Sequence, residues 1–374
     1  MKNVSINPLL KTALFLLVSS IISLSCSEDP IVGDNPPNPP SSFTWKQVGL
    51  DDLTVNRLEL VGNQLYAMTN DGLYTMNVDT DNDFSLVGLK GLNLLDMVML
   101  DENHWLASYR GIDWGGTEIY ETLDGGLNWT VKEHNFGVPE HQLPEITEAV
   151  TDFKWDVANN ILYATGYYVL AKSTDQGTTW EPIWGGWDYL GTGMMIEINP
   201  EKTNDIWFGG QGGFENGYLV NFQNGAVRKE WNDLVPNPTV PQEIVFDNST
   251  PQNIYVGWEG ELNKTSDAGE SWTMLIDRHE ESHFFFGVGV SSINPDLIFA
   301  GKWIKGVDEQ PLTLYYSRDG GDTWQEDTYT DEDFGGIFDL KIISTADQER
   351  IFLALDKGGV YEVTTELNKP QTIQ

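Results

Sequence analysis

Two histidines four residues apart are the first candidates for chemistry in this sequence. The run His279-Glu280-Glu281-Ser282-His283 has the H-E-x-x-H spacing with which a helix presents two imidazoles to one zinc ion. It continues into Phe284-Phe285-Phe286-Gly287 without a helical period, so we expect a loop and no protease chemistry. We expect no cofactor, but a structural metal ion stays open, since two predicted loops hold four of the five histidines: His134, His141, His279 and His283.

An acidic run at Asp79-Thr80-Asp81-Asn82-Asp83 has the form of the start of a calcium-binding loop. Phe84 stands where such a loop needs glycine, and Lys90 stands where it needs its final glutamate. We therefore expect a solvated turn here rather than a calcium site.

Carboxylates are numerous enough to support glycoside cleavage, which needs two of them flanking the scissile bond. Their excess weakens each candidate, because a solvated acidic side chain is the commoner role. Catalytic residues therefore stay unassigned, and an enzyme, if the chain is one, would be a glycoside hydrolase or a polysaccharide lyase. The candidates are Asp113, Glu133, Glu145, Asp188, Glu259, Glu280, Glu281 and Asp308.

The elements that must position these side chains follow from an eight-residue pattern that occurs four times. Each copy reads S/T-x-D-x-G-x-(T/S/N)-W, in which the aspartate can accept backbone N–H groups across a hairpin turn and the glycine can take a positive φ. The final tryptophan would pack between neighbouring sheets. The copies are TLDGGLNW (122–129), STDQGTTW (173–180), TSDAGESW (265–272) and SRDGGDTW (317–324), with the aspartates Asp124, Asp175, Asp267 and Asp319.

This pattern resembles the Asp-box, or BNR repeat, of sialidases, xyloglucanases, sortilin-type ectodomains and photosystem II assembly factors. The four aspartates are 51, 92 and 52 residues apart, so the middle interval holds two units and one copy has decayed near residues 221–225. A strand signature confirms seven units: LYAMT, WLASY, LYATG, IWFGG, IYVGW, IFAGK and IFLAL. The sequence predicts an all-β fold, a single seven-bladed β-propeller, with the four aspartates in structural roles.

The two ends of the predicted propeller complement each other. The last unit finishes at Gly358–Val363 without the expected tryptophan strand, whereas Phe43–Gly49 (FTWKQVG) reads like the outer strands of other units. We therefore expect the N-terminal segment to complete blade seven, which would close the ring and remove an open sheet edge.

Composition limits the partners of the chain. It has 374 residues with 57 acidic and 21 basic side chains, and its formal net charge of −36 would repel phosphate backbones. No nucleic-acid binding is expected, and we expect a monomer. The single cysteine cannot form an internal disulfide framework.

That cysteine, Cys26, follows an apolar run at residues 12–24 that has the length of a signal-peptide core. The stretch Ser23-Leu24-Ser25-Cys26 resembles the lipobox of bacterial lipoproteins, although Ser23 stands where an aliphatic residue is preferred. Glu28 and Asp29 resemble the surface-export signal of lipoproteins from Bacteroidetes-type bacteria. The resemblance implies a lipidated Cys26 and an outer-membrane lipoprotein facing outward, with a signal peptide at 1–25, a Pro-rich linker at 26–42 and the propeller at 43–374. An ordinary signal peptide is the alternative.

Six of the 14 tryptophans lie in or beside loops on the propeller face opposite the four repeats. Long loops on one face of a repeat scaffold usually mark a binding face, and exposed aromatic rings there would stack on sugars. The alternative is that these rings pack the loops onto the barrel, as could the neighbouring Phe284–Phe286. The predicted ligand-binding residues are Tyr109, Trp114, Trp184, Trp187, Tyr189, Trp231, Trp258 and Trp303.

Two functions fit this sequence. One is a surface lipoprotein whose aromatic face binds polysaccharide, with cleavage left open. The other is a non-catalytic propeller that binds a protein partner, like sortilin-type or assembly-factor propellers. Sialidase activity is not expected, because the chain has six arginines and no Arg-Ile-Pro element. Asp-box xyloglucanases use two propellers, and this chain has room for one.

Overall fold

A computed structural model describes the chain at residues 43–111, 118–137, 149–187, 192–212, 217–231, 240–277 and 282–366. All of these lie in the second of the chain's two units, Ser42–Gln374. Cys26, the predicted signal peptide and the predicted linker are outside the described residues, so they stay predictions. Within the described ranges, no helix is long and apolar enough to cross a membrane.

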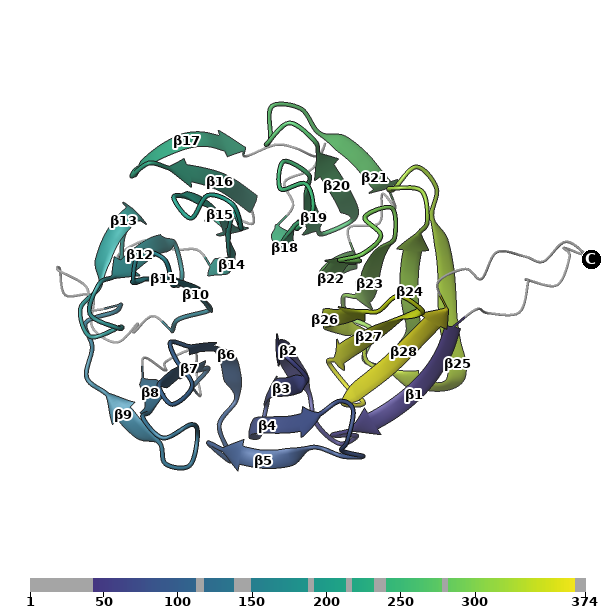
Figure 1. Ribbon diagram of the computed structural model, residues 1–374, viewed down its shortest axis with the longest axis horizontal. Coiled ribbons are helices and arrows are strands. Elements are labelled where there is room, and N and C mark those ends of the chain that lie inside the picture. Colours follow the sequence, from purple (N-terminus) through teal and green to yellow (C-terminus); the bar gives the residue numbers. More distant parts are fainter. Residues whose placement is uncertain are drawn as a thin grey trace, which may run out of the picture. The chain divides into compact units, whose positions relative to one another are not determined.

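Short strands bounded by turn residues build the described part of the chain. Its 28 strands form seven four-stranded antiparallel sheets, which stand as blades around a ring (Figure 1). In six blades the strand order follows the sequence from the centre of the ring outward. The predicted all-β, seven-bladed propeller is therefore confirmed.

Each blade runs from an inner strand at the centre of the ring to an outer strand at its periphery. The first four blades consist of β2 (Val55–Val61), β3 (Gln64–Thr69), β4 (Gly72–Asn77) and β5 (Ser85–Gly88); β6 (Leu94–Met99), β7 (Trp105–Tyr109), β8 (Ile119–Thr122) and β9 (Thr130–Lys132); β10 (Asp152–Asp156), β11 (Ile161–Thr165), β12 (Val169–Ser173) and β13 (Glu181–Gly185); and β14 (Thr192–Ile198), β15 (Asp205–Gln211), β16 (Gly217–Gln223) and β17 (Ala226–Trp231). The last three consist of β18 (Pro241–Phe246), β19 (Ile254–Trp258), β20 (Glu261–Thr265) and β21 (Thr273–Asp277); β22 (His283–Val290), β23 (Ile298–Ile304), β24 (Gln310–Ser317) and β25 (Gln325–Phe334); and β26 (Ile337–Ser344), β27 (Gln348–Leu355), β28 (Val360–Glu366) and β1 (Phe43–Gly49).

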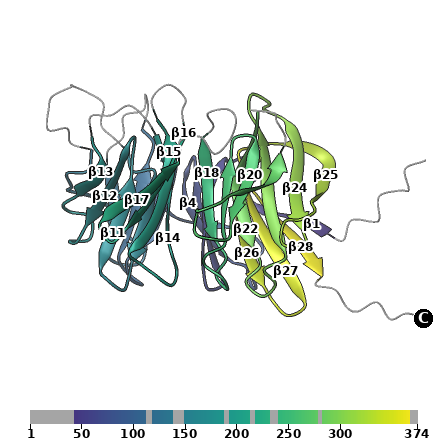
Figure 2. The ribbon, with the colours of Figure 1, turned by 90° about the horizontal axis from the view of Figure 1, so that it is seen from above.

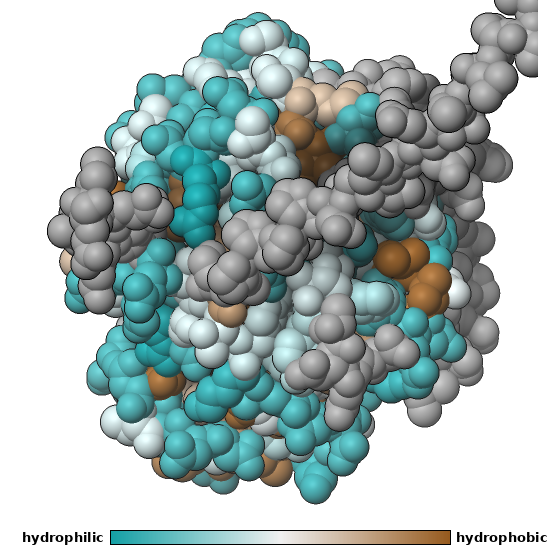
Figure 3. Space-filling model, turned by 90° about the vertical axis from the view of Figure 1, so that its right-hand side faces the viewer, coloured by the Kyte–Doolittle hydropathy of each residue, from teal (hydrophilic) through white to brown (hydrophobic). Residues whose placement is uncertain are grey.

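The hydrophobic core lies between neighbouring blades. Every residue of β19 is buried, because the sheets on either side cover both faces of this second strand, whereas most of the outer strand β21 is exposed. The sheets stand edge-on side by side in Figure 2. The outer surface seen in Figure 3 is mostly hydrophilic where it is coloured, in keeping with the acidic composition.

The N-terminal strand closes the ring as predicted. β1 pairs antiparallel with β28, from Phe43 opposite Thr365 to Gly49 opposite Val360, and blade seven has the order β1-β28-β27-β26. The indole N–H of Trp45 donates to Asp327 Oδ1 on β25 at 2.7 Å, which fastens the closing strand to blade six. β1 therefore covers the edge of β28 and completes the fourth strand of blade seven.

The four Asp-box turns share one geometry. In the third box, Asp267 accepts the hydroxyl of Ser271 at Oδ2 (2.6 Å) and the backbone N–H of Ser271 and the hydroxyl of Thr265 at Oδ1 (both 2.8 Å), and these bonds lower the pKa of Asp267 to about 2. The glycine after the second variable position has a positive φ in every box, for example +83° at Gly269. The decayed copy is a tight turn at Asn224 and Gly225 between β16 and β17. The predicted structural role of the aspartates agrees with this geometry.

Candidate functional site

A polar cavity of about 380 Å³ occupies the centre of the ring, between the inner strands of six blades. Alternate residues of each inner strand point toward this centre, because side chains of a strand face opposite sides in turn. In β2 these are Arg57 and Glu59, and in β10 they include Asp152 and Lys154. The charged residues that line the cavity are Arg57, Glu59, Asp96, Asp152, Lys154, Glu197, Glu243 and Lys341.

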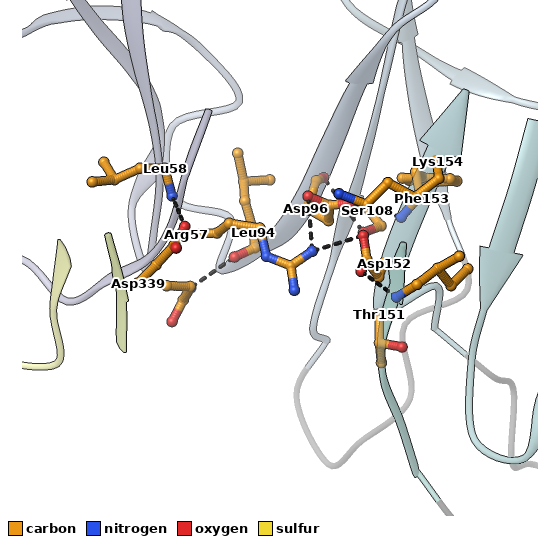
Figure 4. A network of polar contacts seen from close by, with 12 residues as sticks. Arg57, Leu58, Leu94, Asp96, Ser108, Thr151, Asp152, Phe153, Lys154 and Asp339 are labelled. Carbon is orange, nitrogen blue, oxygen red and sulfur yellow. Dashed lines mark hydrogen bonds and ion pairs between the residues drawn. The ribbon is translucent and has the colours of Figure 1, made fainter. Parts of the chain in front are cut away.

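Arg57 forms ion pairs with two aspartates of the cavity wall. Its Nη1 lies 3.2 Å from Asp96 Oδ1 and 2.9 Å from Asp152 Oδ1, so one guanidinium joins three blades (Figure 4). Burial raises the pKa of Asp96 to about 7, and Arg57 opposes that rise. The cation thus compensates two aspartates that are almost entirely buried.

Three buried aspartates also link their inner strands to a neighbouring one. Asp96 Oδ2 accepts the N–H of Phe153 at 2.7 Å, and Asp152 Oδ2 accepts the N–H of Ile196 at 2.8 Å. Asp339 Oδ2 accepts the N–H of Leu58 at 2.8 Å in the same way (Figure 4). These bonds satisfy backbone donors that no strand within the blade can reach.

Two lysines on the cavity wall are also paired. Lys154 Nζ lies 2.7 Å from Glu197 Oε1, and Lys341 Nζ lies 3.0 Å from Asp339 Oδ1. In contrast, Glu59 and Glu243 form no hydrogen bond or ion pair within the described part of the chain. Burial raises the pKa of both, that of Glu243 to about 8.

An apolar rim follows the charged part of the cavity. It is made by Val61, Met99, Trp155 and Val157, at the ends of the inner strands that lead to the second strands. Val61 and Val157 are 47% and 75% exposed, so this end of the cavity meets solvent. The turns from inner to second strand share a ring face with the Asp-box turns, which is the face opposite the predicted binding loops.

The sequence interpretation did not find this cavity, although a signal was present. The inner strands carry charges at alternate positions, as in Arg57-Leu58-Glu59, Asp152-Phe153-Lys154 and Asp339-Leu340-Lys341. Charges with a period of two in an inner propeller strand indicate side chains that face the channel. The prediction from sequence considered polar groups in loops and therefore did not include these charges.

Two of the predicted ligand-binding tryptophans are buried. Trp258 is 2% exposed, and Trp231 is 8% exposed with its ring stacked on Trp207 at 5.0 Å. Phe284 and Phe285 are buried as well, and the expectation that they lie in a loop is wrong. They belong to β22, where the apolar run pairs with β23 and places Phe284 opposite Trp303.

The other described aromatic candidates are half-buried and have partners in the protein. The Trp184 indole donates to Glu230 Oε1 at 3.1 Å, and the Trp303 indole donates to Asp356 Oδ2 at 2.5 Å. Trp187 packs against Phe136, with ring centroids 4.7 Å apart. The Tyr109 hydroxyl donates to Glu118 Oε2 at 3.3 Å. Trp114 and Tyr189 lie outside the described residues, and ligand binding by the whole set stays a prediction.

The remaining acidic and histidine candidates are scattered. Glu133 and Asp308 are exposed and Glu259 is half-buried, whereas Asp113, Glu145, Asp188, Glu280, Glu281, His141 and His279 lie outside the described residues. His134 Nδ1 accepts the N–H of Phe136 at 3.2 Å, and His283 begins a strand. In the described ranges, no three His, Cys, Asp or Glu side chains are grouped so that they could hold a metal ion.

The acidic run at residues 79–83 lies in the turn between β4 and β5, where Asp79 pairs with Arg350 at 2.8 Å. Asp81 Oδ2 accepts the backbone N–H of Asn77 at 2.8 Å. Both carboxylates are therefore engaged in holding this turn.

Comparison with known proteins agrees with the geometry of the turns. The BNR/Asp-box repeat is matched at residues 315–326, which contain the whole of the fourth box. The chain is a seven-bladed propeller with BNR/Asp-box repeats. No curated protein sequence matches it.

Several solved structures share this fold. The extracellular domain of the putative one-component system BT4673 from B. thetaiotaomicron is 14% identical with a TM-score of 0.61, over 87% of this chain and 40% of that one. A GH74 xyloglucanase from Xanthomonas campestris is 14% identical with a TM-score of 0.61, over 86% of this chain and 53% of that one. YCF48 bound to a D1 peptide is 15% identical with a TM-score of 0.56, over 89% of this chain and 97% of that one.

These likenesses establish the fold alone, because the identities are low. The Asp-box propeller spans well under two thirds of the first two proteins and nearly all of the third.

Proposed function

We propose that this Asp-box propeller is a non-catalytic binding protein that recognises a polypeptide at the outer surface of the cell. The burial of the loop-face tryptophans carries this proposal. Sugar-binding platforms need aromatic rings with a free face. Trp258 and Trp231 have no such face, and Trp184 is stacked on Tyr218 with the ring centroids 5.1 Å apart.

The likeness to YCF48 also supports a polypeptide ligand. YCF48, which is described with a bound D1 peptide, matches this propeller over nearly its whole length, so a propeller of this size is enough to bind a peptide.

Polysaccharide binding is the second candidate function. The half-buried rings of Tyr109, Trp184, Trp187 and Trp303 favour it, since each retains some exposed surface on the predicted loop face. Cleavage would further require a pair of carboxylates at a suitable separation.

One experiment distinguishes the two candidate functions. The chain from residue 27 onward is labelled and applied to a random peptide array and to a glycan array, together with Trp187→Ala and, as a matched control, Val131→Ala on the outer strand β9. Binding of peptides by all three proteins, with no glycan signal, supports the proposal. A glycan signal that Trp187→Ala abolishes and Val131→Ala preserves supports polysaccharide binding instead.

Lipid anchoring at Cys26 is part of the proposal. Labelled palmitate should be incorporated into the full chain in its bacterial host and lost in Cys26→Ala, and external protease should degrade the anchored protein on intact cells. Incorporation into Cys26→Ala, or full protection from protease, would contradict an outward-facing lipoprotein.

A further inference from the structure

The central cavity has more carboxyl groups than basic groups. Its wall carries five carboxyl groups and three cations, and each of the three cations already has a carboxylate partner. Glu59 and Glu243 remain without an ion pair within the described part of the chain. The ionised form of such a desolvated carboxyl group is costly, and a cation beside it would recover the lost interaction.

The apolar rim adds a second requirement. A ligand that enters past Val61, Met99 and Val157 must carry apolar surface behind its charged end. Trp155 also lines the cavity, and its indole N–H is buried without an acceptor in the described ranges. A carbonyl oxygen attached to the apolar part of the ligand would satisfy this donor.

We propose that the cavity binds a basic side chain of the polypeptide partner, with its ammonium or guanidinium group at Glu59 and Glu243 and its aliphatic stem along the rim. The inference deepens the proposed function and rests on it. It also moves recognition from the predicted loop face to the face that carries the Asp-box turns.

Other ligand chemistries fit the cavity less well. An anion would meet five carboxylates and no unpaired cation. A neutral saccharide would bring no positive charge to Glu59 and Glu243. The net charge of −36 further favours a cation, because a negative protein concentrates positive ligands in a narrow cleft.

Binding should be coupled to proton release. Glu243 faces Arg57 on β2, Lys341 and Asp339 on β26, and Glu197 on β14, and its pKa of about 8 leaves it mostly protonated at neutral pH. A bound cation stabilises the carboxylate and displaces the proton. The affinity should therefore rise as the pH increases from 7 to 9.

The test uses the chain from residue 27 onward and two small probes. N-acetyl-lysine methylamide carries the ammonium group, and N-acetyl-norleucine methylamide has a similar aliphatic side chain without it. Calorimetry at pH 7.5 in two buffers of different ionisation enthalpy measures affinity and the number of protons released. The variants are Glu243→Gln in the cavity and, as a matched control, Glu201→Gln on the exposed surface. Both replace a glutamate by glutamine.

The lysine probe should bind at least about tenfold more tightly than the norleucine probe and release about half a proton or more. Glu243→Gln should abolish the proton release and weaken binding roughly tenfold at pH 9, whereas Glu201→Gln should change neither. Equal binding of the two probes overturns the proposal. So does a Glu243→Gln variant whose affinity and proton release equal those of the wild type.

Two further measurements distinguish this inference from the proposed function. If peptides without Lys or Arg bind as well as basic ones and Glu243→Gln has no effect on them, polypeptide binding stands and the cavity proposal fails. If spermidine binds in a Glu243-dependent manner but no peptide does, the cation site stands without a polypeptide partner, and the source of the cation in our proposal is wrong.

Discussion

Arg57 in blade one contacts Asp152 in blade three, with Nη1 and Oδ1 2.9 Å apart. The contact passes over blade two, whose Asp96 lies 3.2 Å from the same nitrogen. Because each aspartate also accepts a backbone N–H of the following blade, one side chain supports the relative positions of four inner strands. The charged centre of the ring therefore has a structural role.

Replacement of Arg57 should destabilise the protein in a pH-dependent manner. Arg57→Met leaves Asp96 and Asp152 buried without a counterion, so the free energy of unfolding at pH 8 should fall by about 3 kcal/mol. The fall should be smaller at pH 5, because Asp96, whose pKa burial raises to about 7, is then protonated and needs no counterion. Urea denaturation at both pH values measures this, and an equal loss at both would contradict the assignment.

The raised pKa of Glu243 predicts how stability depends on pH. A carboxyl whose folded pKa of about 8 exceeds its unfolded value favours the folded state at low pH, and this contribution is lost as the pH rises through 8. Glu243→Gln should therefore be more stable than wild type at pH 9, by about 1–3 kcal/mol, and nearly equal at pH 4. Thermal melts of both proteins from pH 4 to pH 9 would show this difference in stability growing with pH. A variant that loses stability at pH 9 would indicate that the carboxylate has a partner.

Removal of the closing strand should open the ring. A chain that begins at residue 50 lacks β1 and exposes the edge of β28, so we expect a lower unfolding temperature and concentration-dependent association. The matched control begins at residue 42 and keeps the strand. Light scattering and calorimetry measure both effects. The variant Trp45→Phe tests one part of the closure, since it removes only the indole donor to Asp327.

Two Asp-box turns hold non-glycine residues in a left-handed conformation. Ala268 and Gln176 have φ of +54° and +59° at the position that Gly125 and Gly320 occupy in the other boxes. Ala268→Gly should stabilise the protein by about 0.5–1 kcal/mol, and Gly320→Ala should destabilise it by a similar amount. Chemical denaturation of both variants checks the sign. Changes in the same direction for both would rule out backbone conformation as the cause.

The tryptophans of the loop side should differ in their contributions to stability. Trp258 is 2% exposed, so Trp258→Ala should lower the free energy of unfolding by about 3–5 kcal/mol. Trp187→Ala should cost less, since this ring is half-buried. Guanidinium denaturation of both variants provides the comparison. A small loss of unfolding free energy for Trp258→Ala would mean that the core around β19 relaxes into the space left by the indole.

The repeat made the fold predictable, because its pattern is local. An aspartate, a glycine and a tryptophan at fixed spacing define a turn, and seven strand signatures define the blades. Ring closure by Phe43–Gly49 followed from one missing outer strand. The position of Phe284 was predicted wrongly because an apolar run beside a long loop does not show where the strand begins.

The candidate site was less accessible from the sequence, because it is assembled from distant residues. Arg57 and Asp152 meet only when three blades curve around one axis, and no local pattern reports that curvature. The unpaired state of Glu243 likewise depends on which neighbours reach it. A search for alternating charges in the inner strands would have found these residues without identifying their partners.

Closure by β1 also has a consequence for the order of events during synthesis. β1 leaves the ribosome before any other strand of the propeller, and its partner β28 leaves last. Six blades can therefore acquire their strands while the chain grows, but the seventh must wait until β28 has been made. Synthesis of β28 thus becomes the event that permits closure of the ring, and until then the first strand remains an unpaired segment that is open to chaperones.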